Sequence, residues 1–163
     1  MNYSRDKLVD MLIVDEGIKL EVYKDSLNID TIGVGRNIEE RGLTDAELQH
    51  LGYTTLQEVY CIGITENGAK HLLGNDIDIV ERELSSVHPC IKDLNEARQI
   101  VCFNMAFNLG VPRLCKFKKM WAAIHSEDFS SAAKEMLHSR WAKQVKDRAI
   151  RLSKIMKTGK LND

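Results

Sequence analysis

The sequence predicts an α+β protein that is mostly α-helical, with a small β-containing lobe near the N-terminus and a helical lobe after it. Residues 20–36 contain two strand-forming runs on either side of a turn. From residue 65 onward, apolar residues recur at helical spacing between capping residues. A chain of 163 residues is long enough for one domain with a core of its own.

The first predicted elements are a helix and a β-hairpin. Ser4 is a suitable N-cap for the helix, and Gly17 is the kind of residue that commonly follows a helix C-terminus. The hairpin follows at 20–36, with residues 26–28 (Ser-Leu-Asn) as its turn. The first helix is therefore expected to end where the β-containing lobe begins.

Two further elements are expected before residue 65. Thr44 and Glu47 have the spacing of a capping box, which predicts a short helix from residue 45. Residues 62–64 (Ile-Gly-Ile) are expected to add a third short strand.

The helical lobe is predicted to begin with a long helix over about 65–86, capped by Thr65. Asp93 with Glu96 is expected to start another helix, which is apolar nearly all round at 100–109 and is therefore expected to be buried. The remaining helices are expected at about 115–125, 129–141 and 144–157.

We therefore predict a single domain over residues 1–163, built from two lobes. Residues 17–64 form the small β-containing lobe, and residues 1–16 with 65–163 form the helical lobe. A cleft between lobes is a usual place for a ligand.

The net charge of −1 hides an uneven distribution. Residues 1–97 hold 9 basic and 19 acidic residues, whereas residues 98–163 hold 14 basic and 5 acidic ones. The basic half favours an anionic polymer as partner, although solvated helix faces would give the same composition. Charge alone is compatible with both nucleic acid and bacterial cell wall.

Composition argues against several other classes of protein. The four cysteines contain no C-x-x-C pair, so we expect reduced thiols, with Cys102 as a small core residue. The five histidines have no ligand spacing, so no metal is expected. No apolar run approaches the ~20 residues of a membrane span. The first residues lack the apolar core of a signal peptide, so synthesis in the cytoplasm is expected.

Three residues near the N-terminus carry the clearest chemistry. Glu16 ends the first apolar helical run, Asp25 lies at the hairpin turn, and Thr31 opens the second strand. An acid at a helix end that faces an acid on a hairpin can bracket a glycosidic bond. The alternatives are a surface glutamate, a turn aspartate bonded to its own backbone, and an ordinary strand-forming threonine.

The same segment resembles the catalytic segment of phage-type lysozymes, the muramidases of T-even bacteriophages in glycoside hydrolase family 24. The motifs that carry the resemblance are DEG (15–17), YKD (23–25) and TIGVG (31–35), in this order. Further matches are LLGNDID (72–78), FNMAFNLG (103–110) and SRWAKQVKDRA (139–149). The resemblance covers nearly the whole chain, is weakest at 37–60, and implies a two-lobed lysozyme-like fold.

The resemblance implies a role for each of the three residues. Glu16 would be the general acid, and Asp25 with Thr31 would hold the water that attacks the anomeric carbon. The implied outcome is inversion without a covalent sugar–enzyme intermediate. Arg148 matches an arginine that pairs with the region of the catalytic glutamate.

Other matched positions depart from the family pattern. Asn108 stands at a substrate-contacting glutamine position with a shorter side chain, and Phe107 beside it is expected to form cleft wall rather than core. Arg36 replaces a usual histidine, and Asp76 matches that histidine's aspartate partner, which predicts an Arg36–Asp76 pair. Trp141 is expected in the core rather than as a sugar platform.

The resulting interpretation is a monomeric endolysin that cleaves the β-1,4 bond between N-acetylmuramic acid and N-acetylglucosamine in bacterial peptidoglycan. It implies no cofactor, no metal, no nucleic-acid partner and no membrane insertion. Synthesis in the host cytoplasm would be followed by action on the wall from the periplasmic side, with lysis of the cell. The alternatives are a chitinase-like preference and a basic module that binds nucleic acid or wall without cleaving it.

Overall fold

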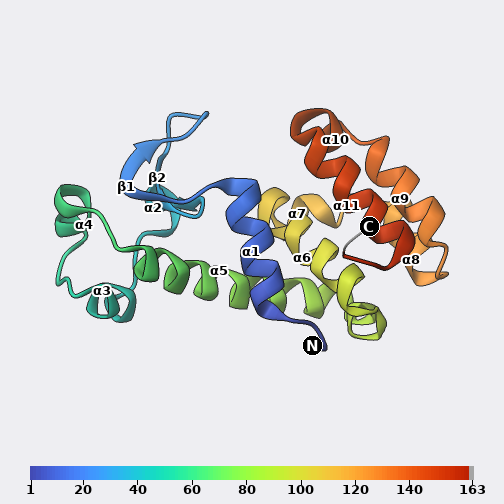
Figure 1. Ribbon diagram of the computed structural model, residues 1–163, viewed down its shortest axis with the longest axis horizontal. Helices are drawn as coiled ribbons and strands as arrows, with labels where there is room; N and C mark the ends of the chain where they lie inside the picture. Colours follow the sequence, from blue (N-terminus) through green and yellow to red (C-terminus); the bar gives the residue numbers. More distant parts are fainter. Residues whose placement is uncertain (162–163) are drawn as a thin grey trace. The chain divides into compact units, whose positions relative to one another are not determined.

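The structure is a computed structural model that describes residues 1–161. It is mostly helical and contains a three-stranded antiparallel sheet, which confirms the predicted fold class. The chain forms two compact units, and Figure 1 labels most of their elements. The sheet unit is Val9–Asp78, and the helical unit is Met1–Leu8 with Ile79–Asp163. The boundaries fall inside α1 (Arg5–Glu16) and α5 (Glu66–Val87).

The sheet unit is built on a hairpin at the predicted place. Strands β1 (Lys19–Lys24), β2 (Asp30–Gly33) and β3 (Arg36–Asn37) lie in that order. The predicted turn is present between β1 and β2, where the N–H of Asn28 donates to the carbonyl of Asp25 at 3.0 Å. Antiparallel pairing places Tyr23 of β1 opposite Thr31 of β2.

Three short helices complete the sheet unit. They are α2 (Ile38–Arg41), α3 (Asp45–Leu51) and α4 (Leu56–Ile62). The predicted capping box is present, because Thr44 and Glu47 exchange side-chain-to-backbone hydrogen bonds at the start of α3. The core of this unit consists of small and branched apolar side chains: Ile32, Ile38, Leu48, Val59, Ile64, Ala69 and Leu72.

The strand predicted at 62–64 is wrong. Ile62 is the last residue of α4, and the third strand is β3 instead. Ile64 still makes one strand-like contact, because its N–H donates to the carbonyl of Leu20 at 2.7 Å. Gly63 permits this approach, since a Cβ at that position would lie 2.4 Å from the same carbonyl oxygen.

The helical unit contains the remaining elements (Figure 1). They are η1 (Pro89–Asp93), α6 (Glu96–Leu109), α7 (Val111–Leu114), α8 (Lys118–His125), α9 (Phe129–Leu137), α10 (Arg140–Val145) and α11 (Asp147–Thr158). Helix α6 packs against α7 and α11, and α9 packs against α8 and α11. Cys102, Phe103 and Met105 on α6 are at most 1% exposed, which confirms the predicted burial of this segment and of Cys102.

Two predicted helix boundaries are wrong because a different polar residue caps the helix. Asn95, rather than Asp93, accepts a hydrogen bond from the backbone N–H of Arg98 and starts α6. The helix predicted over 129–141 ends at Leu137, because Ser139 caps a separate helix, α10, by accepting from the N–H of Ala142.

Candidate active site

Glu16 is the last residue of α1 and lies beside the turn between β2 and β3. The N–H of Gly17 closes the helix on the carbonyl of Ile13 at 2.9 Å, and its φ of +75° turns the chain out of the helix. At Gly35, a Cβ would lie 3.8 Å from Oε2 of Glu16. The carboxylate of Glu16 is therefore next to the backbone of the β2–β3 turn.

Asp25 holds the hairpin turn with one carboxylate oxygen. Its Oδ1 accepts hydrogen bonds from the N–H groups of Leu27 at 2.8 Å and Ile29 at 2.9 Å. Within residues 1–161 no hydrogen bond reaches Oδ2. Asp25 therefore does bond to the backbone of its own turn, but it does so through Oδ1 alone.

Thr31 is nearly fully buried, with 3% of its surface exposed. Its hydroxyl donates to the carbonyl of Ile29 at 3.0 Å. A hydroxyl that donates in this way still has lone pairs to accept a hydrogen bond from water. Thr31 can therefore orient a water only as an acceptor.

Tyr23 is a residue of this site that the sequence analysis missed. Burial raises the pKa of its hydroxyl, and the negative charges of Asp25 and Glu16 raise the pKa further. The phenol therefore lies within the electrostatic reach of both candidate carboxylates. Lys19 lies over its ring, with Nζ 4.1 Å from the centroid. The YKD motif contained the signal, because its first residue faces Thr31 across the sheet.

Arg36 forms the predicted pair with Asp76, and the pair is buried. Nε donates to Oδ2 of Asp76 at 2.9 Å, and Nη2 lies 2.6 Å from Oδ1. Arg36 also donates from Nη1 and Nη2 to the two carboxylate oxygens of Glu47, at 3.2 and 2.9 Å. Arg41 forms a further ion pair with Asp76. Glu47 is a partner of Arg36 that was not predicted from the sequence.

The pKa values of the two carboxyls that bind Arg36 are shifted in opposite directions. Burial acts to raise the pKa of Glu47, but hydrogen bonds from Arg36, Asn75 and the backbone of Thr44 hold that pKa at about 2. Burial raises the pKa of Asp76 even though Arg36 acts to lower it. Glu47 is therefore ionised at neutral pH and forms an ion pair with the guanidinium of Arg36.

The other predicted site residues belong to the helical unit. Arg148 donates from Nε to Oδ1 of Asn104 at 3.0 Å and is 8% exposed. Trp141 is 3% exposed, which agrees with its predicted place in the core, and its Nε1–H donates to Oδ1 of Asn108 at 2.8 Å. Phe107 is half-buried. The interaction of Arg148 with the region of Glu16 stays a prediction.

The residues that the structure describes contain neither a cluster suited to a metal ion nor a helix suited to spanning a membrane. Among residues 1–161, no three His, Cys, Asp or Glu side chains gather in a way that could hold a metal ion. None of the described helices has the length and apolar character needed to cross a bilayer.

Comparisons with known proteins agree with the motifs. Residues 14–155 match the family model described as Phage lysozyme. Probable T4-type lysozyme 1 of Dictyostelium discoideum is 32% identical over 161 residues, covering 94% of this chain and 95% of that protein. Probable T4-type lysozyme 2 of the same organism is 30% identical over 164 residues, covering 96% of each. The pre-baseplate central spike protein Gp5 of Enterobacteria phage T4 is 34% identical over 161 residues, covering 94% of this chain and 28% of that protein.

Proposed function

Because the chain belongs to the phage lysozyme family, whose members are muramidase glycoside hydrolases, we propose that it is an endolysin that uses Glu16, Asp25 and Thr31. Peptidoglycan is the substrate that the family implies. The bond cut would be the β-1,4 bond from N-acetylmuramic acid to N-acetylglucosamine. The observation that supports the assignment of residues is geometric: within the sheet unit, Glu16 lies beside the β2–β3 turn at Gly35, and Thr31 lies on the strand that follows the Asp25 turn.

Glu16 is proposed as the general acid. Its carboxyl would give its proton to the glycosidic oxygen as the bond to the anomeric carbon breaks. Gly35 has no side chain beside this carboxyl, and a Cβ there would lie 3.8 Å from Oε2 of Glu16.

Asp25 and Thr31 are proposed to act on the water. The oxygen Oδ2 of Asp25 would accept a proton from the water as the water oxygen bonds to the anomeric carbon. Thr31 would accept the water's other hydrogen and fix its direction. Attack from the face opposite the leaving group gives inversion, and no bond forms between sugar and protein.

The surrounding residues are proposed to position these groups. Arg36 joins β3 to α3 and α5 through Glu47 and Asp76, and so supports the turn beside Glu16. Arg148 is proposed to orient the region of Glu16. Phe107 and Asn108 are proposed to contact the sugar chain, with the amide of Asn108 oriented by Trp141.

The sugar products test this proposal directly. Purified peptidoglycan is digested, and the new reducing ends are identified after reduction and acid hydrolysis. The proposal requires muramic acid at every new reducing end, and glucosamine ends would contradict it. Nuclear magnetic resonance in the first minutes, before mutarotation, should show the α-anomer from the β-linked substrate.

In the cell, the proposed endolysin acts as a monomer from the periplasmic side of the wall and lyses its host. The similarity to Gp5 favours a second candidate, in which the same chemistry serves a phage spike. Induced expression together with a membrane-permeabilising protein separates the two. The endolysin proposal expects rapid lysis that Glu16→Gln abolishes, whereas absence of lysis by an active enzyme would favour the spike candidate.

A further inference from the structure

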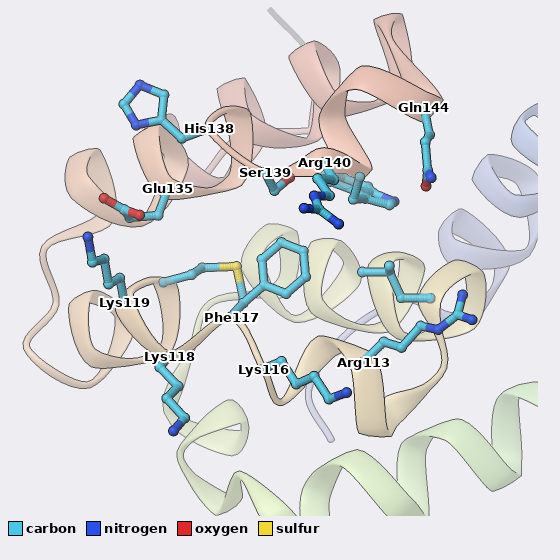
Figure 2. A pocket seen from close by; sticks show the side chains of 13 residues that line it. Arg113, Lys116, Phe117, Lys118, Lys119, Glu135, His138, Ser139, Arg140 and Gln144 are labelled. Carbon is cyan, nitrogen blue, oxygen red and sulfur yellow. The ribbon is translucent and has the colours of Figure 1, made fainter.

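The helical unit contains a pocket of about 840 Å³ that involves none of the candidate catalytic residues (Figure 2). It is lined from the end of α6 through α7 to the start of α8, and by the end of α9 and by α10. All of its lining residues belong to the helical unit. We call it the basic pocket, because its lining holds Arg113, Lys116, Lys118, Lys119 and Arg140 against one acid, Glu135.

The cations differ in the direction that they face. Figure 2 shows Arg140 and Phe117 pointing toward one another across the pocket, with Arg113 and Lys116 on the same side as Phe117. Lys118 points away from the pocket, and Lys119 lies near Glu135 at its other end. Three cations from two separate segments therefore line the pocket, with Arg140 directed at the ring of Phe117 and the ends of Arg113 and Lys116 extending away from that ring.

These three cations have no acidic partner. In the part of the chain that the structure describes, Arg113, Lys116 and Arg140 make no ion pair. Cations on an open surface are usually solvated and need no partner. Here they line a concave surface, where charges of one sign concentrate the potential and attract an anion.

The middle of the pocket is apolar. Phe117 is half-buried, and its ring stands edge-on to the buried ring of Trp141, with centroids 6.5 Å apart at 79°. This contact fixes the ring and leaves it directed at Arg140. A ligand that fits would carry more than one negative group, spaced along a chain whose units also offer a carbon face.

A sugar-phosphate repeat has this alternation. Each phosphate offers oxygens that match the fork of an arginine, and the sugar or polyol between two phosphates offers carbon atoms to an aromatic ring. Carboxylates of a wall peptide are also anionic, but they do not flank a ring in a regular repeat.

We propose that the basic pocket binds a phosphate-bearing glycopolymer of the bacterial cell wall. The choice of a wall polymer rests on the proposed function, which places the protein at the wall. The pocket is a second, non-catalytic binding site that holds the enzyme on phosphate-rich wall. Removal of its charges should weaken retention on such walls and leave bond cleavage unchanged.

The binding test uses the full chain carrying Glu16→Gln, so that the wall stays intact, and a purified poly(ribitol phosphate) glycopolymer as the probe. Arg113→Gln with Arg140→Gln removes two pocket charges. Lys92→Gln with Lys134→Gln removes two exposed charges outside the pocket and is the matched control. We expect the first pair to raise Kd at least tenfold and the control pair to change it less than twofold.

Four results would overturn the proposal. Equal losses for the two pairs would mean that only the net charge matters. Stronger competition by phosphate-free muropeptides would make the pocket a carboxylate site, and stronger competition by RNA of equal charge would make it a nucleic-acid site. Absence of polymer binding would also contradict it.

A cleavage assay separates this proposal from the proposed function. With Glu16 intact, Arg113→Gln with Arg140→Gln should cleave phosphate-free peptidoglycan at the normal rate. If the wild-type chain binds the polymer but cleaves nothing, the proposed function fails and the pocket assignment stands. If cleavage is normal and the polymer does not bind, the pocket assignment fails alone.

Discussion

Arg36 donates two hydrogen bonds to the carboxylate of Glu47 inside the sheet unit, from Nη1 to Oε2 at 3.2 Å and from Nη2 to Oε1 at 2.9 Å. Both side chains are almost completely buried. The same guanidinium reaches Asp76 on α5, so one side chain joins β3, α3 and α5. An imidazole at this position has at most two N–H donors and could not make all of these bonds.

Arg36→Met should strongly destabilise the protein. The substitution leaves buried Glu47 without its cation and Asp76 with Arg41 alone. Breaking a buried ion pair from one side costs about 3–5 kcal/mol. Denaturant titration measures the change in the free energy of unfolding. Lys24→Met is the matched control, because Lys24 also bridges two carboxylates, Asp30 and Glu39, but does so on the surface. Equal losses for the two variants would contradict the role assigned to Arg36.

Glu47 should make stability depend on acid pH. Its pKa is lowered from 4.5 to about 2 in the folded protein, so the ionised form stabilises the fold above pH 4.5. That contribution is lost as the pH falls from about 4.5 to 2. Asp76 has a raised pKa and acts in the opposite sense. Glu47→Gln should therefore flatten the decline in stability over this range, which denaturation at several pH values can measure. An unchanged slope would show that the charge of Glu47 is not linked to folding.

Gly35→Ala should reduce activity more than it reduces stability. The residue has a φ of +71°, where a Cβ costs about 1–2 kcal/mol. The added Cβ would also lie 3.8 Å from Oε2 of Glu16 and occupy space beside the proposed acid. Gly52→Ala is the control, since Gly52 has a φ of +82° and a Cβ there would meet nothing within 4 Å. We expect similar losses of stability but a loss of wall clearing only at Gly35. Similar activities for the two variants would contradict this account of the turn.

Asp25→Asn should keep the hairpin and lose most of the activity. The amide oxygen of asparagine can still accept the two backbone hydrogen bonds that Oδ1 accepts now, from Leu27 and Ile29. The charge that would take the proton from water is removed, so clearing should fall by about 10²-fold or more. Removal of that charge should also lower the raised pKa of Tyr23, which ultraviolet titration against Tyr23→Phe can follow. Trapping of a covalent sugar adduct on Asp25 in the wild type would overturn the inverting mechanism.

The parts of the fold that the sequence could predict are those with local signals. The capping box at Thr44 and Glu47 and the turn after Asp25 depend only on residues a few positions apart. The third strand could not be found in this way, because a two-residue strand such as β3 has no alternating pattern to read. Residues 62–64 have strand-like composition, but Ile62 ends α4, and Ile64 contacts β1 through the hydrogen bond from its N–H to the carbonyl of Leu20.

The candidate site shows the same limit. Glu16, Asp25 and Thr31 stand in motifs that the sequence displays, and Asp76 could be matched to Arg36 through the resemblance. Glu47 was already explained by its capping role, so nothing local marked it as a tertiary partner. Its pairing with Arg36 depends on how α3 packs in the sheet unit, and the spacing of apolar residues in the sequence does not predict that packing.

The assignment of Glu16 as the acid is the central claim, and the initial rate at which new muramic acid reducing ends appear tests it most directly. Wild type, Glu16→Gln and Glu21→Gln are compared on the same peptidoglycan. Glu21 is an exposed carboxylate on β1 and serves as the control. Glutamine keeps the shape of glutamate but has no transferable proton, so the rate should fall at least ~10²-fold for Glu16→Gln alone. A folded Glu16→Gln protein that releases muramic acid ends at the wild-type rate would contradict the account.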